Sequence, residues 1–142
     1  MDEKQVDDLV RRCQEAKEQS YSPYSKFRVG AALLCQDGRI YTGCNVENVS
    51  YGLTICAERT ALVKAVSEGH RKFKAIAIAS DLANKTISPC GACRQFLVEF
   101  GVSWDVIMTK PDMTYKTMKT GELLPLCVVS ESLEEEKVSK LA

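Results

Sequence analysis

Two short cysteine-bearing segments, far apart in the chain, restrict its fold more than any other feature. The first segment is CAE at positions 56–58, and the second is PCGAC at positions 89–93. Three cysteine thiolates can bind one zinc ion and leave its fourth tetrahedral position open to water. The two segments can share an ion only if the chain brings them together in space. We therefore expect Cys56, Cys90 and Cys93 to meet and to bind one Zn²⁺ per chain.

The composition is that of one globular domain without a strongly charged partner. The chain has 142 residues, of which 45% are hydrophobic and 27% are charged, which suits a single domain over 1–142. Its 19 basic residues balance 19 acidic ones. No nucleic-acid partner is expected, because phosphate binding normally shows a basic excess. No apolar run approaches the roughly 20 residues that cross a bilayer, so no membrane partner is expected.

The first residues lack the apolar core of a signal peptide, which predicts a cytoplasmic protein that could also reach the nucleus by diffusion. A reducing compartment keeps the seven cysteines as thiols, so each is a metal ligand or a small core residue. The cysteines outside the two segments are expected in the core: Cys13, Cys35, Cys44 and Cys127.

Apolar spacing and turn residues predict helices that alternate with strands. Helices are expected over 1–20, 56–68 and 90–100. Strands are expected over 28–35, 39–44, 74–80, 105–109 and 115–120. Residues 45–54 are expected to form a polar loop, and the charged tail 131–142 a short exposed helix.

This alternation is typical of crossover connections in which helices cover a sheet. The sequence therefore predicts an α/β fold with a mixed five-stranded sheet. Both cysteine segments begin helices that follow a strand and a loop, and binding sites in open α/β sheets gather at that end.

The position of the cysteines at helix starts also predicts their ionisation. Helix N-termini carry unpaired N–H groups and about half a positive charge, which favours thiolate over thiol. Three thiolates give Zn²⁺ a net charge of −1, which the helix ends offset, and Arg59 could add a hydrogen bond near the sulfurs. Glu58, two residues after the first cysteine, can turn back toward the open metal position and carry protons.

The same residues allow two less specific interpretations. A structural zinc site needs a fourth protein ligand, for which Cys35, Cys44 and His70 are the candidates. Alternatively, the three thiols are inert and Glu58 only complements a helix dipole. The joint pattern of Cys-Ala-Glu followed by Pro-Cys-x-x-Cys favours the catalytic interpretation, because it is the zinc deaminase signature in which the glutamate is an acid/base rather than a ligand.

Four stretches resemble the cytidine deaminase family in its small homotetrameric form. They are YSxFxVGAAL from position 24, GCNVEN from 43, CAERTA from 56 and SPCGACRQ from 88. A first ligand that is cysteine rather than histidine resembles the nucleoside enzymes more than the polynucleotide editors or the deoxycytidylate deaminases. The resemblance implies a three-layer α/β/α cytidine deaminase-like fold. It also implies hydrolytic deamination of cytidine and deoxycytidine to uridine and deoxyuridine plus ammonia, a reaction of pyrimidine salvage.

The resemblance implies roles for individual residues as well. Glu58 would take a proton from the attacking water and deliver it to N3 and then to the leaving amine. The ribose 3′-hydroxyl would be held by Asn45 and Glu47. In the implied homotetramer each pocket is completed by neighbouring subunits. Phe27 would pack on the base, and Val49 and Tyr51 would reach a nucleoside in the neighbouring subunit. The full set of implied substrate contacts is Phe27, Asn45, Glu47, Val49, Tyr51 and Ala57.

Two positions depart from the family's pattern. Family members carry a phenylalanine in Leu-Leu-Pro-x-x-Phe near the C-terminus, which stacks on the base in an adjacent subunit, whereas Val128 stands there in this chain. Losing one face of a stack costs roughly 1 kcal/mol, so Val128→Phe is expected to lower the KM for cytidine. Met113 stands where family turns usually have glycine, and because methionine disfavours positive φ we expect a different turn type.

Three other functions compete with the first. A related deaminase could act on another aminopyrimidine nucleoside, and Val128 leaves that question open. A catalytically silent zinc-bearing paralogue would serve as a subunit or binding module, but it would have no need for Glu58. A nucleic-acid editor is disfavoured by the neutral charge and by Glu47, whose carboxylate would repel a 3′-phosphate.

Overall fold

The computed structural model describes residues 1–139, so the last residues of the predicted tail 131–142 lie outside the described part. These residues form three α-helices, five strands and two short 3₁₀ helices. In chain order they are α1 (Glu3–Lys17), β1 (Val29–Cys35), β2 (Ile40–Cys44), η1 (Tyr51–Leu53), α2 (Ala57–Ser67), β3 (Phe73–Ser80), α3 (Gly91–Val98), β4 (Asp105–Thr109), β5 (Tyr115–Lys119) and η2 (Ser130–Glu134).

The five strands form one mixed sheet in the order β2-β1-β3-β4-β5. β1 pairs antiparallel with both β2 and β3, β3 pairs parallel with β4, and β4 pairs antiparallel with β5. The connection through α2 therefore passes over β1, whereas the connection through α3 joins neighbouring parallel strands. The predicted mixed five-stranded sheet is confirmed.

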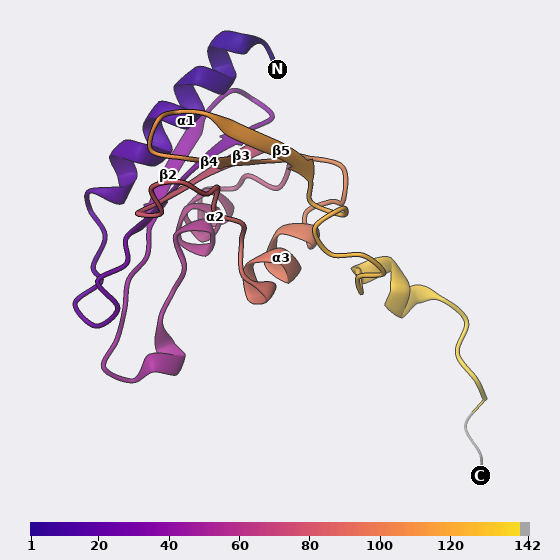
Figure 1. The fold of residues 1–142 in the computed structure, drawn as a ribbon. Coiled ribbons are helices and arrows are strands. Elements are labelled where there is room, and N and C mark those ends of the chain that lie inside the picture. Colours follow the sequence, from indigo (N-terminus) through magenta and orange to yellow (C-terminus); the bar gives the residue numbers. More distant parts are fainter. Residues whose placement is uncertain (140–142) are drawn as a thin grey trace.

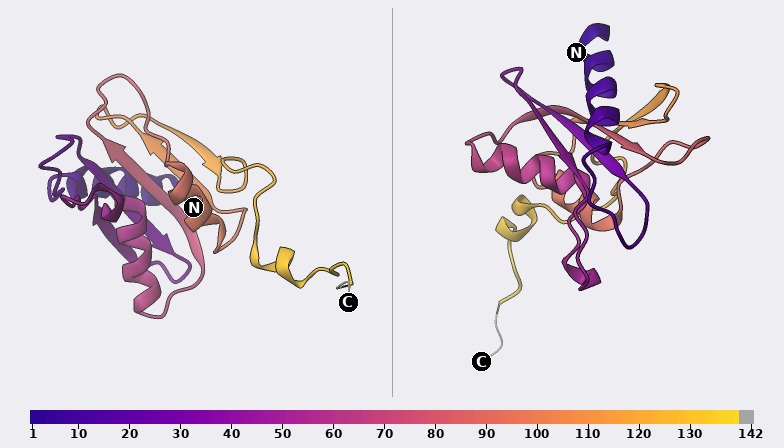
Figure 2. Two further views of the ribbon diagram at one scale, coloured as in Figure 1. Left: turned by 90° about the horizontal axis from the view of Figure 1, so that it is seen from below. Right: turned by 90° about the vertical axis from the view of Figure 1, so that its left-hand side faces the viewer.

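Helices cover both faces of this sheet, as the ribbon views show (Figures 1 and 2). α1 packs on one face, where its Leu9, Val10 and Cys13 meet alanines of β3. α2 and α3 pack on the other face, where Leu62 and Leu97 join the larger core around Ile76. Because successive strand residues point to opposite faces, the alternating apolar residues of β1, β3 and β4 supply both cores. The sheet thus lies between a layer formed by α1 and a layer formed by α2 and α3, which is the predicted three-layer arrangement.

The first helix is shorter than predicted. It begins with a capping box between Asp2 and Gln5 and ends at Lys17 rather than at residue 20. The chain leaves the helix because Tyr21 pairs with the residues after β2, with its backbone N–H donating to Asn45 O at 3.0 Å. The long-range bridge between Tyr21 and Val46 thus overrides the local helical pattern. Within residues 1–139, no helix has the length and apolar character needed to cross a membrane.

The expectation for the turn at Met113 is wrong. Met113 adopts a φ of 74°, so the turn keeps the left-handed residue that glycine would favour. The backbone N–H of Met113 donates to Lys110 O at 2.9 Å, and Thr114 N donates to Asp112 Oδ1 at 3.0 Å. These bonds hold the turn in a conformation that methionine alone disfavours.

Candidate metal centre and active site

Cys56 and Cys90 occupy the same structural position at the starts of two neighbouring helices. Each is the N-cap residue of its helix, α2 for Cys56 and α3 for Cys90, with an extended backbone. An N-cap side chain usually bonds to the free N–H groups of the first turn, but neither cysteine makes such a bond. Both sulfurs therefore remain available for a shared ligand, and Cys93 adds a third from the first turn of α3.

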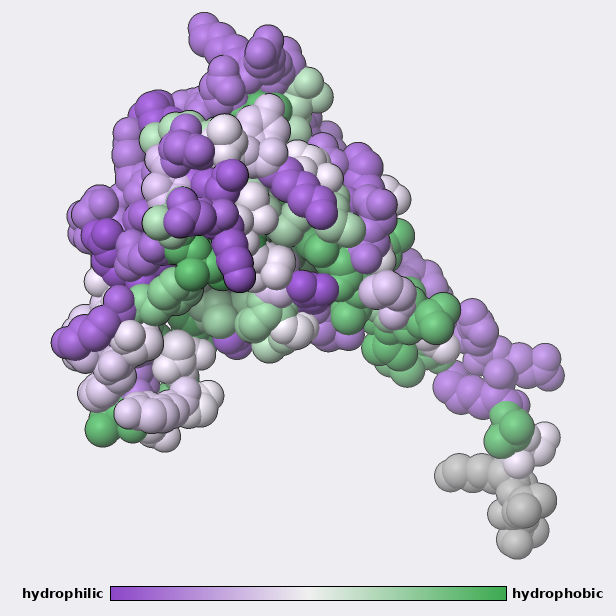
Figure 3. All heavy atoms as spheres, viewed as in Figure 1, coloured by the Kyte–Doolittle hydropathy of each residue, from purple (hydrophilic) through white to green (hydrophobic). Residues whose placement is uncertain are grey.

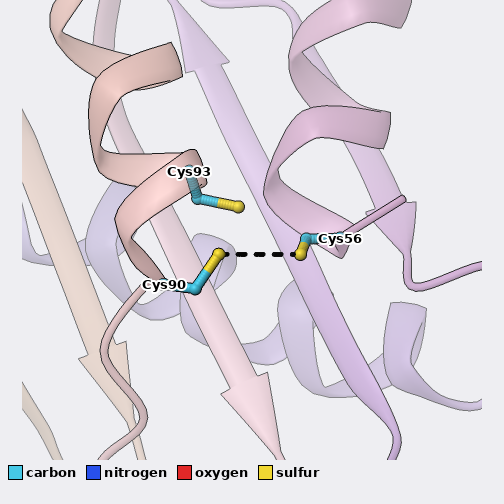
Figure 4. A group of neighbouring side chains, drawn as sticks. All are labelled: Cys56, Cys90 and Cys93. Carbon is cyan, nitrogen blue, oxygen red and sulfur yellow. Dashed lines mark hydrogen bonds between the residues drawn. The ribbon is translucent and has the colours of Figure 1, made fainter. Parts of the chain in front are cut away.

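The three sulfurs converge as the close-up shows (Figure 4). Cys56 Sγ lies 3.8 Å from Cys90 Sγ, and the three sulfurs lie within 4.8 Å of one another. A tetrahedral zinc ion with Zn–S bonds of about 2.3 Å places its sulfur ligands about 3.8 Å apart. The donor set and its spacing therefore fit zinc, and one tetrahedral position is left for a non-protein ligand.

A hydrogen-bond network around the sulfurs favours negative charge on Cys56. Its pKa is lowered to about 5 because Cys93 and then Arg59 hydrogen-bond to its sulfur, against the effect of burial. Cys93, the thiol that donates to Cys56, has a raised pKa in consequence. Arg59 Nη2 donates to Cys56 Sγ at 3.2 Å, which is the contact that the sequence suggested for this arginine.

Glu58 is almost completely buried in the first turn of α2, with 4% of its surface exposed. Burial raises the pKa of its carboxyl group to about 7, and the charge of Cys56 adds to this, while Cys93 and Arg59 act in the opposite direction. A buried carboxyl group with such a pKa can hold or release a proton near neutral pH. Its place beside Cys56 makes it a candidate acid/base at the metal position.

The three candidate fourth ligands lie elsewhere in the molecule. Cys44 Sγ donates to the carbonyl of Gln19, and Cys35 and His70 belong to a separate cluster with Asp37. No fourth histidine, cysteine or carboxylate of residues 1–139 joins the three sulfurs. A structural zinc site would need such a ligand, so the arrangement favours an open metal position.

Asn45 and Glu47, predicted to hold the ribose, bind the 20–29 segment in this structure. Asn45 is 7% exposed, and its side chain accepts from Ser20 Oγ and Val29 N and donates to Phe27 O. Glu47 Oε1 accepts from the backbone of Tyr24 and Ser25 at 3.0 and 3.1 Å. Both side chains thus shape this loop, a role that their sequence positions do not reveal.

Glu47 also lines a pocket of about 250 Å³. Tyr24 and Tyr51 contribute its aromatic walls, with ring centroids 5.7 Å apart. Tyr24 and Ser25 had no predicted role, although both lie in one of the stretches that carry the family resemblance. The lining residues are Tyr24, Ser25, Glu47, Asn48, Tyr51 and Thr54.

The remaining predicted contacts differ in exposure. Ala57 is buried beside Glu58, and Phe27 is half-buried. Val49 and Tyr51 are 76% and 73% exposed, on the segment that projects below the sheet in Figure 1. Val128 is exposed too, and its carbonyl accepts from Gln95 Nε2 at 3.0 Å. Hydrophobic surface gathers on this lower side and continues onto the C-terminal segment (Figure 3).

Comparisons with known proteins agree with this geometry. Residues 3–109 match the family model of the cytidine and deoxycytidylate deaminase zinc-binding region. A probable cytidine deaminase of Dictyostelium discoideum is 51% identical over 94% of this chain and 90% of its own length. A cytidine deaminase of Sporosarcina psychrophila is 49% identical over 90% of this chain and 94% of its own.

A solved structure shares the fold as well. The crystal structure of cytidine deaminase from Burkholderia pseudomallei superposes with a TM-score of 0.83 at 43% identity, covering 90% of this chain and all of that one. The helices, the mixed sheet and the open three-sulfur group thus define a zinc-binding deaminase domain. This chain belongs to the cytidine and deoxycytidylate deaminase family, as the sequence resemblance predicted.

Proposed function

We propose that this chain is a zinc-dependent cytidine deaminase, which hydrolyses cytidine and deoxycytidine to uridine and deoxyuridine with release of ammonia. One observation carries the proposal. A buried glutamate, Glu58, adjoins a three-sulfur group that leaves one metal position open. The relatives named cytidine deaminase support the choice of substrate.

Cys56, Cys90 and Cys93 would hold the zinc ion. When bound, zinc acts as a Lewis acid that makes water a nucleophile near neutral pH. Arg59 donates to Cys56 Sγ at 3.2 Å, and with the two helix N-termini it offsets the excess negative charge of three thiolates. Arg59→Gln tests this role, which is wrong if zinc content and turnover both stay unchanged.

Glu58 would move the protons of the reaction. It accepts a proton from the attacking water as the oxygen bonds to C4 of the pyrimidine, and it delivers that proton to N3. It then carries the second proton of the water to the amino group, so that the C4–N bond breaks and ammonia leaves. The dry surroundings of Glu58 suit a group that must be both base and acid within one turnover.

Asn45 and Glu47 would hold the sugar with the bonding capacity that remains to them. The amide of Asn45 keeps one N–H after its three bonds, and the carboxylate of Glu47 has about four acceptor sites, of which the loop uses three. Together they can bind a hydroxyl group. Phe27 would pack on the base, and the Glu47 carboxylate would repel a 3′-phosphate.

The exposed Val49 and Tyr51 would complete the pocket of a neighbouring subunit in a homotetramer. Val49 and Tyr51 are 76% and 73% exposed, and the nearby Leu53 is 63% exposed. This run of exposed apolar side chains supports the assembly, because contiguous exposed apolar patches commonly mark interfaces. A cytoplasmic location suits the seven cysteines, none of which forms a disulfide.

The test is to follow the ultraviolet change from cytidine to uridine with zinc-loaded protein, with protein stripped by a chelator, and after zinc is restored. We expect turnover of cytidine and deoxycytidine, loss on stripping and recovery with zinc. A single-stranded oligonucleotide containing cytosines serves as the competing substrate. Deamination of the oligonucleotide without turnover of either nucleoside would overturn the proposal.

A further inference from the structure

A second group of metal-binding side chains lies at the other end of α2 from Cys56. Cys35, Asp37 and His70 bring one sulfur, one carboxylate oxygen and one imidazole nitrogen to within 4.8 Å of one another. We propose that Cys35, Asp37 and His70 form a second zinc site, separate from the three-cysteine group and independent of the proposed deaminase reaction.

His70 is held in place by the cap of α2. His70 N donates to Ala65 O and Gly69 N donates to Val66 O, both at 3.0 Å, and Gly69 has a φ of 100°. These two bonds are the Schellman motif, which fixes the chain direction after a helix. The Tyr41 ring packs edge-on against the imidazole, with ring centroids 5.4 Å apart, so the ring plane of His70 is supported as well.

The hairpin after β1 positions the other two ligands. Asp37 Oδ1 accepts from Arg39 N at 3.0 Å, which leaves Oδ2 directed at His70 Nδ1, 3.7 Å away. Gly38 N donates to Cys35 O at 3.0 Å, and Cys35 N donates to Arg39 O at 2.9 Å. Zinc bonds to nitrogen and oxygen of about 2.1 Å imply a separation near 3.4 Å. Asp37 and His70 therefore need to close by only a few tenths of an ångström, and the Cys35 sulfur already lies within 4.8 Å of both ligand atoms.

The donor set suits zinc in charge and type. One thiolate and one carboxylate neutralise Zn²⁺, and the mixture of sulfur, nitrogen and oxygen is one that zinc accepts. The C-terminal end of a helix carries partial negative charge, so the end of α2 also favours a cation. Burial raises the pKa of the Cys35 thiol to about 11, and the ion must displace that proton. We therefore expect weaker zinc binding here than at the three-cysteine group.

A bound ion would tie the β1–β2 hairpin to the end of α2. Without an ion, Asp37 and His70 form at most a long ion pair on the surface, which contributes little to stability. A protein that binds a second ion and one that does not differ in the number of metal ions held per chain and in the absorption spectrum of the metal-loaded protein. Cobalt is a suitable probe, because Co²⁺ takes zinc-like geometry and absorbs strongly when a thiolate is bound.

The experiment titrates Co²⁺ into full-length protein that already holds one equivalent of zinc, while the zinc retained by the chain is measured in parallel. We expect one further equivalent of cobalt, with thiolate charge-transfer absorption and without loss of zinc. Cys35→Ala and His70→Gln are expected to abolish this absorption. Cys13→Ala is the matched control, because Cys13 is also fully buried but lies on the opposite face of the sheet.

Asp37→Asn keeps the test decisive if the buried substitutions disturb folding. Asp37 is an exposed residue, and asparagine preserves the acceptor for Arg39 N. We expect its dissociation constant for the second cobalt ion to rise by about tenfold or more, since one anionic ligand is lost. Binding of no second equivalent, or the same absorption in Cys35→Ala, would overturn the proposal.

Discussion

Two sets of residues differ in burial within this chain. One set is proposed to carry out the reaction, and the other is proposed to complete the pocket of a neighbouring subunit. Glu58 is 4% exposed and Cys93 is fully buried, both in helix first turns that pack on the sheet. Val49 and Tyr51 lie on a projecting segment and are 76% and 73% exposed. On the proposed roles, a single chain would build the reaction centre but would leave part of substrate binding at its surface. Substitutions in the buried region of Glu58 and Cys93 should affect metal binding and kcat. Substitutions in the exposed region of Val49 and Tyr51 should affect KM and assembly.

The largest expected effect comes from removing a sulfur ligand. Cys93→Ala leaves two thiolates, too few to hold zinc tightly, so we expect zinc content to fall to near zero and turnover to become undetectable. Metal analysis and the cytidine assay check both effects. Cys127→Ala is the control for loss of a thiol outside the group. If Cys93→Ala retained a full equivalent of zinc, the three-sulfur site would be wrong.

In the exposed region, Tyr51→Ala is expected to raise the KM for cytidine by about tenfold, which corresponds to about 1.4 kcal/mol of binding. The kcat should change far less, because Tyr51 does not touch the sulfur group. Steady-state kinetics and sedimentation check substrate binding and assembly together. Tyr115→Ala is the matched control, because Tyr115 is also an exposed tyrosine but lies on β5. A fall in kcat with unchanged KM would remove the distinction between the two regions.

The packing of α2 can be disturbed without substituting a residue of either region. A Cβ atom at Gly43 would lie 2.5 Å from Ala61 N and 2.7 Å from Ala57 O. Both are backbone atoms of α2, so the helix that carries Glu58 must move. We expect Gly43→Ala to destabilise the fold by about 1–3 kcal/mol and to weaken zinc binding. Denaturant unfolding measures this, with Gly52→Ala, where the added methyl meets open space, as the unchanged control.

The smallest expected effect lies away from both regions, at Asp81. Its pKa is lowered chiefly by the hydrogen bond from Arg28, whose Nη2 lies 2.9 Å away. A lowered folded-state pKa gives stability that is present above the ordinary aspartate pKa and is lost as the pH falls through the folded value. Asp81→Asn should therefore cost about 1 kcal/mol at pH 7 and less at an acidic pH below the ordinary aspartate pKa. An equal loss at both pH values would contradict the ion pair.

Local patterns predicted the elements of this fold and the meeting of its three cysteines. The spacing of apolar residues located the helices and strands, and the convergence of Cys56, Cys90 and Cys93 follows from two helices that begin side by side. The order of the strands was not predicted. Hydrophobic alternation cannot distinguish a crossover between neighbouring strands, as through α3, from one that passes over β1, as through α2.

Long-range contacts explain what the sequence did not reveal. The amide of Asn45 holds Phe27 O and Val29 N, although these residues lie far before it in the chain. The meeting of Cys35 with His70 depends likewise on the pairing of β1 with β3, in which Cys35 lies opposite Phe73. The roles assigned to Glu58, Asn45, Glu47 and Tyr51 stay predictions until substitution tests them.

The most direct test of the account measures zinc content and cytidine turnover in the wild type and in Glu58→Gln. Glutamine keeps the size of the side chain but cannot carry the proton, and general acid–base catalysis contributes about 10²–10⁴-fold. We expect one tightly held zinc at the three-cysteine group in both proteins and a kcat lower by at least about 10²-fold in Glu58→Gln. Equal turnover by the two proteins at equal zinc content would contradict the central role of Glu58.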